Sequence, residues 1–208
     1  MERRNEQAGE SDMTFSIIIP SHNGASRIAK ALDSCISQSF KDFELIVVCD
    51  ACTDNTVDIA RSYNAKVIEV DVRRDGLARN AGIDAAVGDW ILFLDDDDWW
   101  LHEFVFQQLK QIIGDGSADV INYAVIWKHN GYVSYPPGRF LGMAAGHCWK
   151  RSFVADTRFD SASYSSDTHF LDALIAKRPV SLTTALPMYY YNYMREGSLS
   201  DLHKKGEI

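Results

Sequence analysis

The sequence predicts an α/β fold with a mostly parallel central sheet flanked by helices. Two observations lead to this prediction. Short apolar runs rich in β-branched residues alternate with segments of helical spacing through the first half of the chain. In addition, the 208 residues, of which 46% are hydrophobic and 24% charged, suit one globular domain rather than a disordered or fibrous chain.

Four apolar runs are the predicted strands of the first half, and they are Phe15–Pro20, Phe43–Cys49, Lys66–Val70 and Trp90–Leu94. The first and the last have the continuous apolar character of strands buried on both faces. Because a helical segment separates each run from the next, we expect the strands to lie parallel.

Helical segments follow each of these strands. They are Ala25–Gln38, a helix capped by Thr53–Asn55 and reaching Tyr63, Leu77–Ala86, and His102–Ile113. The third contains small residues that allow close packing.

The second half is less regular. Ala118–Trp127 is a predicted strand, His129–Gly131 a turn, and Asp167–Ala176 a helix. Val180–Tyr193 has the pattern of one or two aromatic strands around a proline, whereas Phe140–Cys148 gives no clear prediction. We expect residues 1–13 to be a disordered tail and residues 14–208 to be a single domain.

Composition excludes several classes of protein. The net charge of −8 disfavours non-specific binding to nucleic acid or to an anionic membrane. No apolar run approaches the ~20 residues of a membrane span, and Met1–Asp12 has no apolar stretch typical of a secretory signal. The four cysteines are too few and too scattered for a disulfide scaffold, so a reducing cytosol is the simplest setting.

Four consecutive carboxylates, Asp95–Asp98, come directly after the fourth strand. There they face the edge of the sheet where open α/β folds bind ligands. Mg²⁺ or Mn²⁺ would relieve their repulsion and could bridge a diphosphate. The alternative is a solvated acidic turn with helix-capping aspartates, a role that suits Asp98 best. Trp99 and Trp100 could stack on sugar faces, although core packing of at least one is the expectation.

The ends of the first and second strands carry further polar residues. In Pro20–Gly24, His22 could stack on a base or belong to an ordinary polar loop. Asp50 could accept a hydrogen bond from a base N–H or a ribose hydroxyl, or cap a turn or helix. Cys49-x-x-Cys52 resembles half of a redox or zinc site, but no second pair follows. In Gly76–Gly82, Arg79 could contact phosphate or base, or be solvated.

Taken together, four stretches resemble the family 2 glycosyltransferases of the GT-A fold. In chain order they are SIIIPSHN, VVCDACTDNT, GLARNAG and ILFLDDDDWW. The resemblance implies the transfer of a sugar, with inversion, from a nucleotide-sugar to a glycan or lipid-linked acceptor in polysaccharide biosynthesis. The expected donor is a UDP-sugar. It also implies that residues 14–115 bind the donor and residues 116–208 the acceptor.

For the donor base, the resemblance implies that Pro20, His22 and Asn23 lie beside it and that Asp50 pairs with its N–H. Arg79 would lie near the base and the phosphates. The family often has Tyr in place of His22, Asp in place of Cys49, and Gly-Ser in place of Ala51–Cys52.

For the diphosphate, the resemblance implies that Asp97 is the main ligand of Mn²⁺ or Mg²⁺. Asp95 and Asp96 would contact ribose or support the metal, with Asp95 as a second ligand. Arg195 could meet the diphosphate, or be a solvated surface arginine.

For the acceptor, the resemblance implies that Asp167 is the catalytic base that takes a proton from a hydroxyl. The family often has Glu where Ser166 precedes it, and helix capping is the alternative role. His169 is a weaker candidate, because helical spacing turns it away from Asp167.

Other functions remain open at this point. A non-catalytic nucleotide-sugar-binding module would keep Asp50 and the acidic residues but lack a working base. A nucleotidyltransferase would be expected to have a basic, glycine-rich phosphate loop, which Ser21–Arg27 is not. We expect a cytoplasmic protein, peripheral at the inner membrane face if the acceptor is lipid-linked. A homodimer through Tyr189–Tyr193 is left open.

Overall fold

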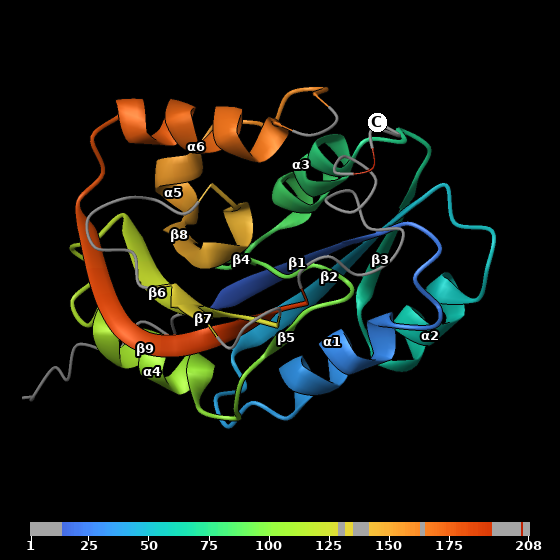
Figure 1. Cartoon of the computed structure of the whole chain (residues 1–208), viewed down its shortest axis with the longest axis horizontal. Coiled ribbons are helices and arrows are strands. Elements are labelled where there is room, and N and C mark those ends of the chain that lie inside the picture. Colours follow the sequence, from blue (N-terminus) through green and yellow to red (C-terminus); the bar gives the residue numbers. More distant parts are fainter. Residues whose placement is uncertain (1–13, 129–131, 135–141, 163–164, 193–204, 206–208) are drawn as a thin grey trace, which may run out of the picture.

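The computed structural model describes residues 14–128, 132–134, 142–162, 165–192 and 205. The predicted tail 1–13, the turn at His129–Gly131 and Arg195 lie outside these residues. Within them, nine strands form one sheet, in the order β3-β2-β1-β4-β8-β6-β9-β5, with β7 paired to β6 (Figure 1). The α/β prediction is confirmed.

The strands are β1 (Phe15–Ser21), β2 (Phe43–Asp50), β3 (Lys66–Val70), β4 (Trp90–Phe93), β5 (Trp99–Trp100), β6 (Val120–Trp127), β7 (Tyr132–Ser134), β8 (His147–Lys150) and β9 (Ser181–Tyr191). The pairings from β3 through β2 and β1 to β4 are parallel, as predicted. The pairings of β8 with β4 and β6 are antiparallel, and β9 runs parallel to β6. The predicted aromatic segment forms one strand, β9, rather than two. Its pairing with β6 shifts register between Asn122 and Val125, opposite Pro187.

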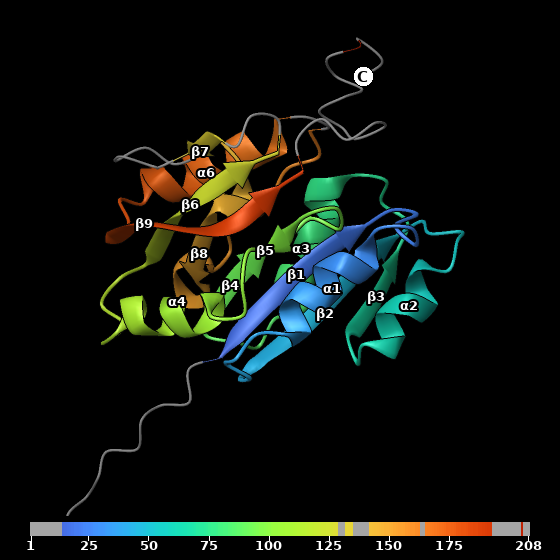
Figure 2. The ribbon, with the colours of Figure 1, turned by 60° about the horizontal axis from the view of Figure 1, so that its bottom comes forward.

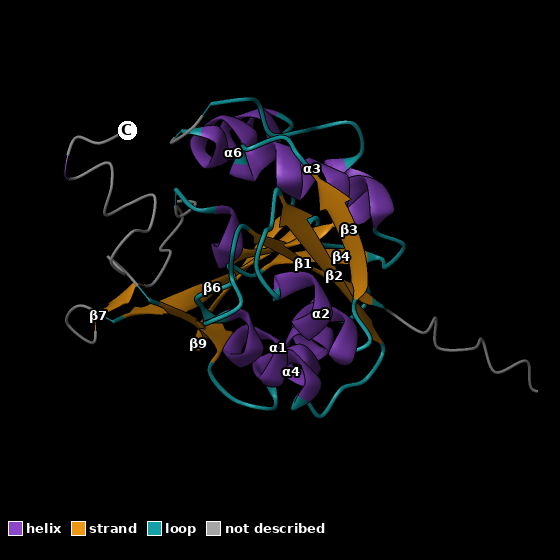
Figure 3. Ribbon diagram, turned by 90° about the vertical axis from the view of Figure 1, so that its right-hand side faces the viewer, coloured by secondary structure: helices purple, strands orange, loops and turns teal. Residues whose placement is uncertain are grey.

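The helices are α1 (Ile28–Ile36), α2 (Thr56–Ser62), α3 (Asp75–Ala85), α4 (Val105–Ile113), α5 (Arg151–Val154) and α6 (Ser166–Ala176), with a 3₁₀ turn at Ala144–Gly146. α3 and α6 cover one face of the sheet, and α1, α2 and α4 cover the other (Figure 3). Figure 2 shows α1 and α2 over the part of the sheet that contains β1, β2 and β3. None of the described helices is both long and apolar enough to cross a bilayer.

Helical periodicity explains how these helices attach to the sheet. α1 buries Ile28, Ala31, Leu32 and Cys35, which share one helical face. α3 approaches β1 closely, because a Cβ on Gly82 would lie only 2.3 Å from Ile18 Cγ2. Because β1, β2 and β4 are parallel, they end on a common edge of the sheet. The loops that follow them meet there.

Candidate active site

The four aspartates after β4 form a tight turn, the acidic turn (Asp95–Asp98), closed by a 3.1 Å hydrogen bond from the Asp98 N–H to the Asp95 carbonyl. Their side chains alternate in exposure. Asp96 and Asp98 are buried, with 7% and 0% of their surface exposed, whereas Asp95 and Asp97 are partly exposed. The turn therefore directs two carboxylates inward and leaves two accessible to a ligand.

Asp96 is held by protein donors. Arg27 donates to both carboxylate oxygens, from Nε to Oδ1 at 2.7 Å and from Nη2 to Oδ2 at 2.8 Å. The Ser21 hydroxyl also donates to Oδ2, at 2.5 Å. Burial raises the pKa of Asp96, while Arg27 and Ser21 act in the opposite direction. If Asp96 were to contact a bound ligand directly, these hydrogen bonds to Arg27 and Ser21 would have to break.

Arg79 gathers three carboxylates around one buried guanidinium. Its Nη2 donates to Asp95 Oδ1 at 2.6 Å, and its Nη1 lies 3.5 Å from Asp167 Oδ1 and pairs with Asp75 one helical turn earlier. Arg79 is 3% exposed. Burial opposes its charge, but Asp167 and Asp95 raise its pKa above the usual value. Arg79 thus links residues that come from α3, α6 and the acidic turn.

Asp167 lies in the first turn of α6, as predicted. Its Oδ2 accepts a 2.9 Å hydrogen bond from the Ala144 N–H. His169 is turned elsewhere, since it is exposed and its Nδ1 lies 2.5 Å from Asp160 Oδ2. Of the two candidate bases, only Asp167 shares a partner with the acidic turn.

Asp98 is satisfied by the end of β9. The Tyr189 hydroxyl donates to its Oδ2 at 2.6 Å, and the Asn192 N–H donates to its Oδ1 at 2.7 Å. The same hydroxyl accepts from the Asp95 N–H at 3.2 Å. Burial raises the pKa of Asp98 well above its usual value, with the charges of Asp95 and Asp97 adding to the effect.

The loop after β1 lies against the loop after β2. Pro20 is buried within β1, and the His22 Nδ1–H donates to the Asp50 carbonyl at 2.7 Å. Asn23 has a positive φ of 47°, and its Oδ1 accepts from the Thr53 N–H at 2.8 Å. The structure thus brings the predicted base-binding residues together.

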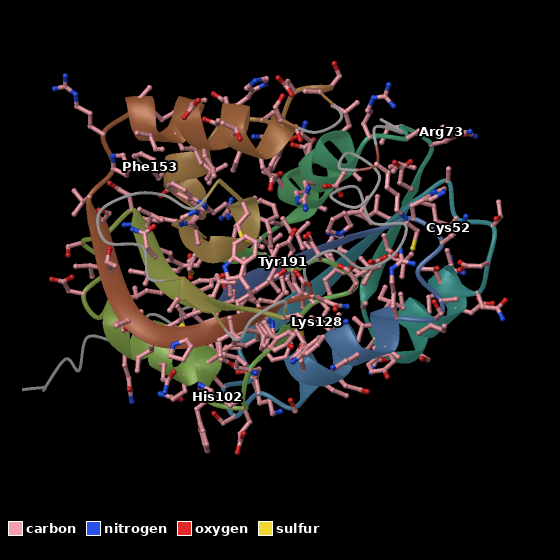
Figure 4. The ribbon with its side chains drawn as sticks, viewed as in Figure 1. Cys52, Arg73, His102, Lys128, Phe153 and Tyr191 are labelled. Atoms are coloured by element: carbon pink, nitrogen blue, oxygen red, sulfur yellow. The ribbon has the colours of Figure 1, made fainter. Side chains whose placement is uncertain are left out.

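The Asp50 carboxylate organises the loop after β3. It accepts hydrogen bonds from the backbone N–H groups of Val72, Arg73 and Arg74, at 2.8, 2.9 and 3.1 Å. In Figure 4, Arg73 and Cys52 lie toward the same end of the molecule, in the loops beyond β3 and β2. Asp50 therefore has the turn-forming role that the sequence left open, and its contact with a base stays a prediction.

Cys49 and Cys52 are free thiols. Burial raises the pKa of Cys49 to about 12, and the Cys52 thiol donates to the Ser21 carbonyl at 3.3 Å. Among the described residues, no group of three His, Cys, Asp or Glu side chains is arranged as a ready metal centre. These observations give no support to a redox or zinc site at this pair.

The two tryptophans after the acidic turn pack within the protein. Trp100 is 2% exposed and belongs to the core, as expected of at least one of them. Trp99 is covered on both faces, because Tyr190 stacks on it with ring centroids 4.2 Å apart and Lys30 Nζ lies 3.0 Å from the ring centroid. Stacking of Trp99 on a sugar would require one of these partners to leave.

The acidic turn fits a divalent cation that is completed by a ligand. Magnesium and manganese commonly bind one or two carboxylates together with substrate phosphates, so a full protein cage is not required. Six carboxylates gather here, those of Asp75, Asp95–Asp98 and Asp167, and the described salt bridges pair four of them with two arginines, Arg27 and Arg79. Burial, together with the charges of Asp97 and Asp167, raises the pKa of Asp95 to about 6, while Arg79 acts in the opposite direction.

Sequence reasoning assigned no site role to Arg27, Asp75 or Tyr189. The i,i+4 spacing of Asp75 and Arg79 was a signal that could have revealed their pairing. No comparable signal exists for Arg27 and Tyr189, whose partners lie 69 and 91 residues away.

A sheet of this topology, with an acidic turn where its parallel strands end, is the arrangement expected of GT-A glycosyltransferases. The family profile described as "Glycosyl transferase family 2" matches residues 16–168, and the chain belongs to this family.

Curated relatives agree with this assignment. The chain is 35% identical over 127 residues to the amylovoran biosynthesis glycosyltransferase AmsB of Erwinia amylovora, an alignment that covers 55% of this chain and 42% of AmsB. It is 31% identical to the putative glycosyltransferase EpsH of Bacillus subtilis, over 91% of this chain and 64% of EpsH. The chain therefore spans less than two thirds of these relatives.

Solved structures show the same fold. S. aureus TarS superposes with a TM-score of 0.77 at 22% identity, over 86% of this chain and 37% of that one. Its 1–349 fragment in complex with UDP-GlcNAc gives a TM-score of 0.76 at 20% identity, over 91% and 61%. Glucosyl-3-phosphoglycerate synthase from Mycobacterium tuberculosis, in complex with Mn²⁺, UDP and phosphoglyceric acid, gives 0.67 at 18%, over 92% and 74%.

Proposed function

We propose that the chain is an inverting glycosyltransferase that moves a sugar from a nucleoside-diphosphate sugar, in first place a UDP-sugar, to a hydroxyl of a glycan or lipid-linked acceptor. One observation carries the proposal. Arg79 holds Asp95 of the acidic turn and Asp167 of α6 on a single buried guanidinium, so the candidate diphosphate site and the candidate base lie together.

The geometry supports a division of roles. Asp167 is oriented by the Ala144 N–H and by Arg79, and in its ionised form it takes the proton of the attacking hydroxyl. Asp97, with Asp95 beside it, would hold Mn²⁺ or Mg²⁺. When bound, the metal neutralises negative charge on the departing diphosphate. The pairing of Arg79 with carboxylates favours a positioning role over phosphate binding.

The donor base would lie over the loops that carry Pro20, His22, Asn23 and Asp50. Two similar structures contain UDP-GlcNAc or UDP with Mn²⁺, which supports a uridine nucleotide and a divalent metal for this chain. The contact of Arg195 with the diphosphate, the acceptor half 116–208, a cytoplasmic location, membrane contact and a homodimer remain predictions.

A titration calorimeter and a donor-hydrolysis assay test the proposal together. We expect UDP to bind in the presence of Mn²⁺ and binding to weaken when EDTA removes the metal. Asp97→Asn should abolish the metal-dependent part of binding. Asp167→Asn should bind UDP as wild type but lower turnover by about 100-fold or more, the usual contribution of a general base. Asp172→Asn, an exposed change on the same helix, is the matched control.

The same experiments distinguish the enzyme from the alternative of a non-catalytic binding module. This alternative is motivated by Ser166, which is buried and stands where the family often has Glu. Metal-dependent binding of UDP with no hydrolysis or transfer of any tested nucleotide-sugar would favour the module. No binding of UDP, GDP or dTDP, with or without metal, would contradict both readings.

A further inference from the structure

Arg27 connects two loops that are distant in sequence. Besides its two bonds to Asp96, its Nη1 donates to the Asn23 carbonyl at 2.8 Å and its Nη2 to the His22 carbonyl at 2.9 Å. One guanidinium thus makes four hydrogen bonds, two to the acidic turn and two to the loop that follows β1. The side chain is 22% exposed; the bonds to Asp96 and Asn23 are partly buried, whereas the bond to the His22 carbonyl is exposed.

The surroundings of Asp96 leave little freedom for its carboxylate. Gly24 faces it so closely that a Cβ at this position would lie 2.5 Å from Asp96 Oδ2 and 2.2 Å from Ser21 Oγ. Arg27 therefore holds Asp96 against the end of β1. Since Asp96 and Asp97 are consecutive in a tight turn, an inward Asp96 fixes the direction in which Asp97 leaves the backbone.

We infer that Arg27 is a positioning residue of the donor site, which sets the distance and orientation between the loop His22–Asn23 and the outward carboxylate of Asp97. The inference rests on the proposed function, in which that loop takes the base and Asp97 takes the metal and diphosphate. Without Arg27, Asp96 would lie between Asp95 and Asp97 and lose the ion pair that the described residues give it, and mutual repulsion would open the turn.

The shape of the guanidinium is essential to this role. It presents donors in a planar fork that can meet both oxygens of a carboxylate and two carbonyls at once. A lysine ammonium supplies a similar charge at one point and cannot span these four acceptors. The inference therefore predicts that Arg27→Lys is not a conservative change.

The first experiment measures UDP binding against Mn²⁺ concentration for Arg27→Met, Arg27→Lys and wild type. Misplacing a binding group by about 1 Å can cost up to a hundredfold. We expect both variants to need at least about tenfold more Mn²⁺ for half-maximal UDP binding. Arg61→Met, which breaks an exposed 2.8 Å pair with Glu69, should match wild type. If Arg27→Lys binds as wild type does, charge alone suffices and the inference is overturned.

The second experiment needs no ligand, so that failure of the proposed function can be told apart from failure of this inference. Amide hydrogen exchange should quicken in both 22–24 and 95–98 in the two Arg27 variants, while exchange in β1 and β2 stays unchanged. Unchanged exchange at 95–98 would overturn the inference. A further outcome is that wild type binds no nucleotide while exchange still quickens in both segments of the Arg27 variants. In that case the link that Arg27 makes between the two loops is supported, and the assignment of a donor site is wrong. If Arg27→Met does not fold, Arg27→Lys, which keeps the charge, carries both tests.

Discussion

Tyr189 ties β9 to the acidic turn, and Tyr189→Phe would remove only the hydroxyl that does so. This hydroxyl donates to Asp98 Oδ2 at 2.6 Å and accepts from the Asp95 N–H at 3.2 Å. Both Tyr189 and Asp98 are fully buried. Because phenylalanine keeps the ring and its edge contact with Trp100, the change isolates two hydrogen bonds from the packing of the core.

The expected cost follows from the groups left unpaired. A buried carboxyl that loses a donor costs about 1–3 kcal/mol, and the longer bond from the Asp95 N–H adds up to about 1 kcal/mol. We expect the free energy of unfolding to fall by about 1–4 kcal/mol in urea denaturation. At roughly 3 °C per kcal/mol for a domain of this size, the melting temperature should fall by roughly 3–12 °C.

Tyr190→Phe provides the matched control, one residue along the same strand. Its ring stacks on Trp99, and the substitution retains that ring. We expect it to change the free energy of unfolding by less than about 0.5 kcal/mol. The reasoning would be refuted if Tyr189→Phe were as stable as wild type, or if the two variants lost stability equally.

Two further predictions concern packing and thiol chemistry. Gly82→Ala should lower the free energy of unfolding by about 1–3 kcal/mol, because the new Cβ would meet Ile18 in the core. Gly142→Ala, where no described residue beyond its chain neighbours has a heavy atom within 4 Å of an added Cβ, should change little, and equal losses would be inconsistent with this explanation. In a thiol titration with Ellman's reagent, the partly exposed Cys52 alone should react rapidly in the native protein, and all four cysteines should react in urea. A second fast thiol would show that the burial of Cys35, Cys49 or Cys148 is incorrect.

The sequence was sufficient to predict the parallel half of the sheet, because each strand there is an apolar run followed by a helical period. β8 escaped prediction for a physical reason. It is only four residues long, and its first residue, His147, is a buried polar side chain whose Nδ1 lies 2.8 Å from Asn122 Oδ1 on β6. Hydropathy cannot show a strand whose burial depends on a polar pair across the sheet.

The residues of the candidate site also fall into those that the sequence could predict and those that it could not. The carboxylates of the acidic turn and Asp167 could be located from strand ends and family motifs. The partners that hold them could not, since Arg27 and Tyr189 meet their aspartates through the register of distant segments. Asp50 shows the limit most clearly. Its position was predicted, but its three backbone donors depend on the conformation of a loop in which Arg73 has a φ of 51°.

Four adjacent aspartates are tolerated here because the turn gives each a different environment. Asp95 and Asp96 are each paired with an arginine, on opposite sides of the turn. Asp98 is buried on neutral donors, and its raised pKa favours the uncharged form. Asp97 is partly exposed, and in the proposed function it is the carboxylate that meets the cation and the diphosphate. The turn therefore tolerates its four aspartates because neighbouring carboxylates have separate partners.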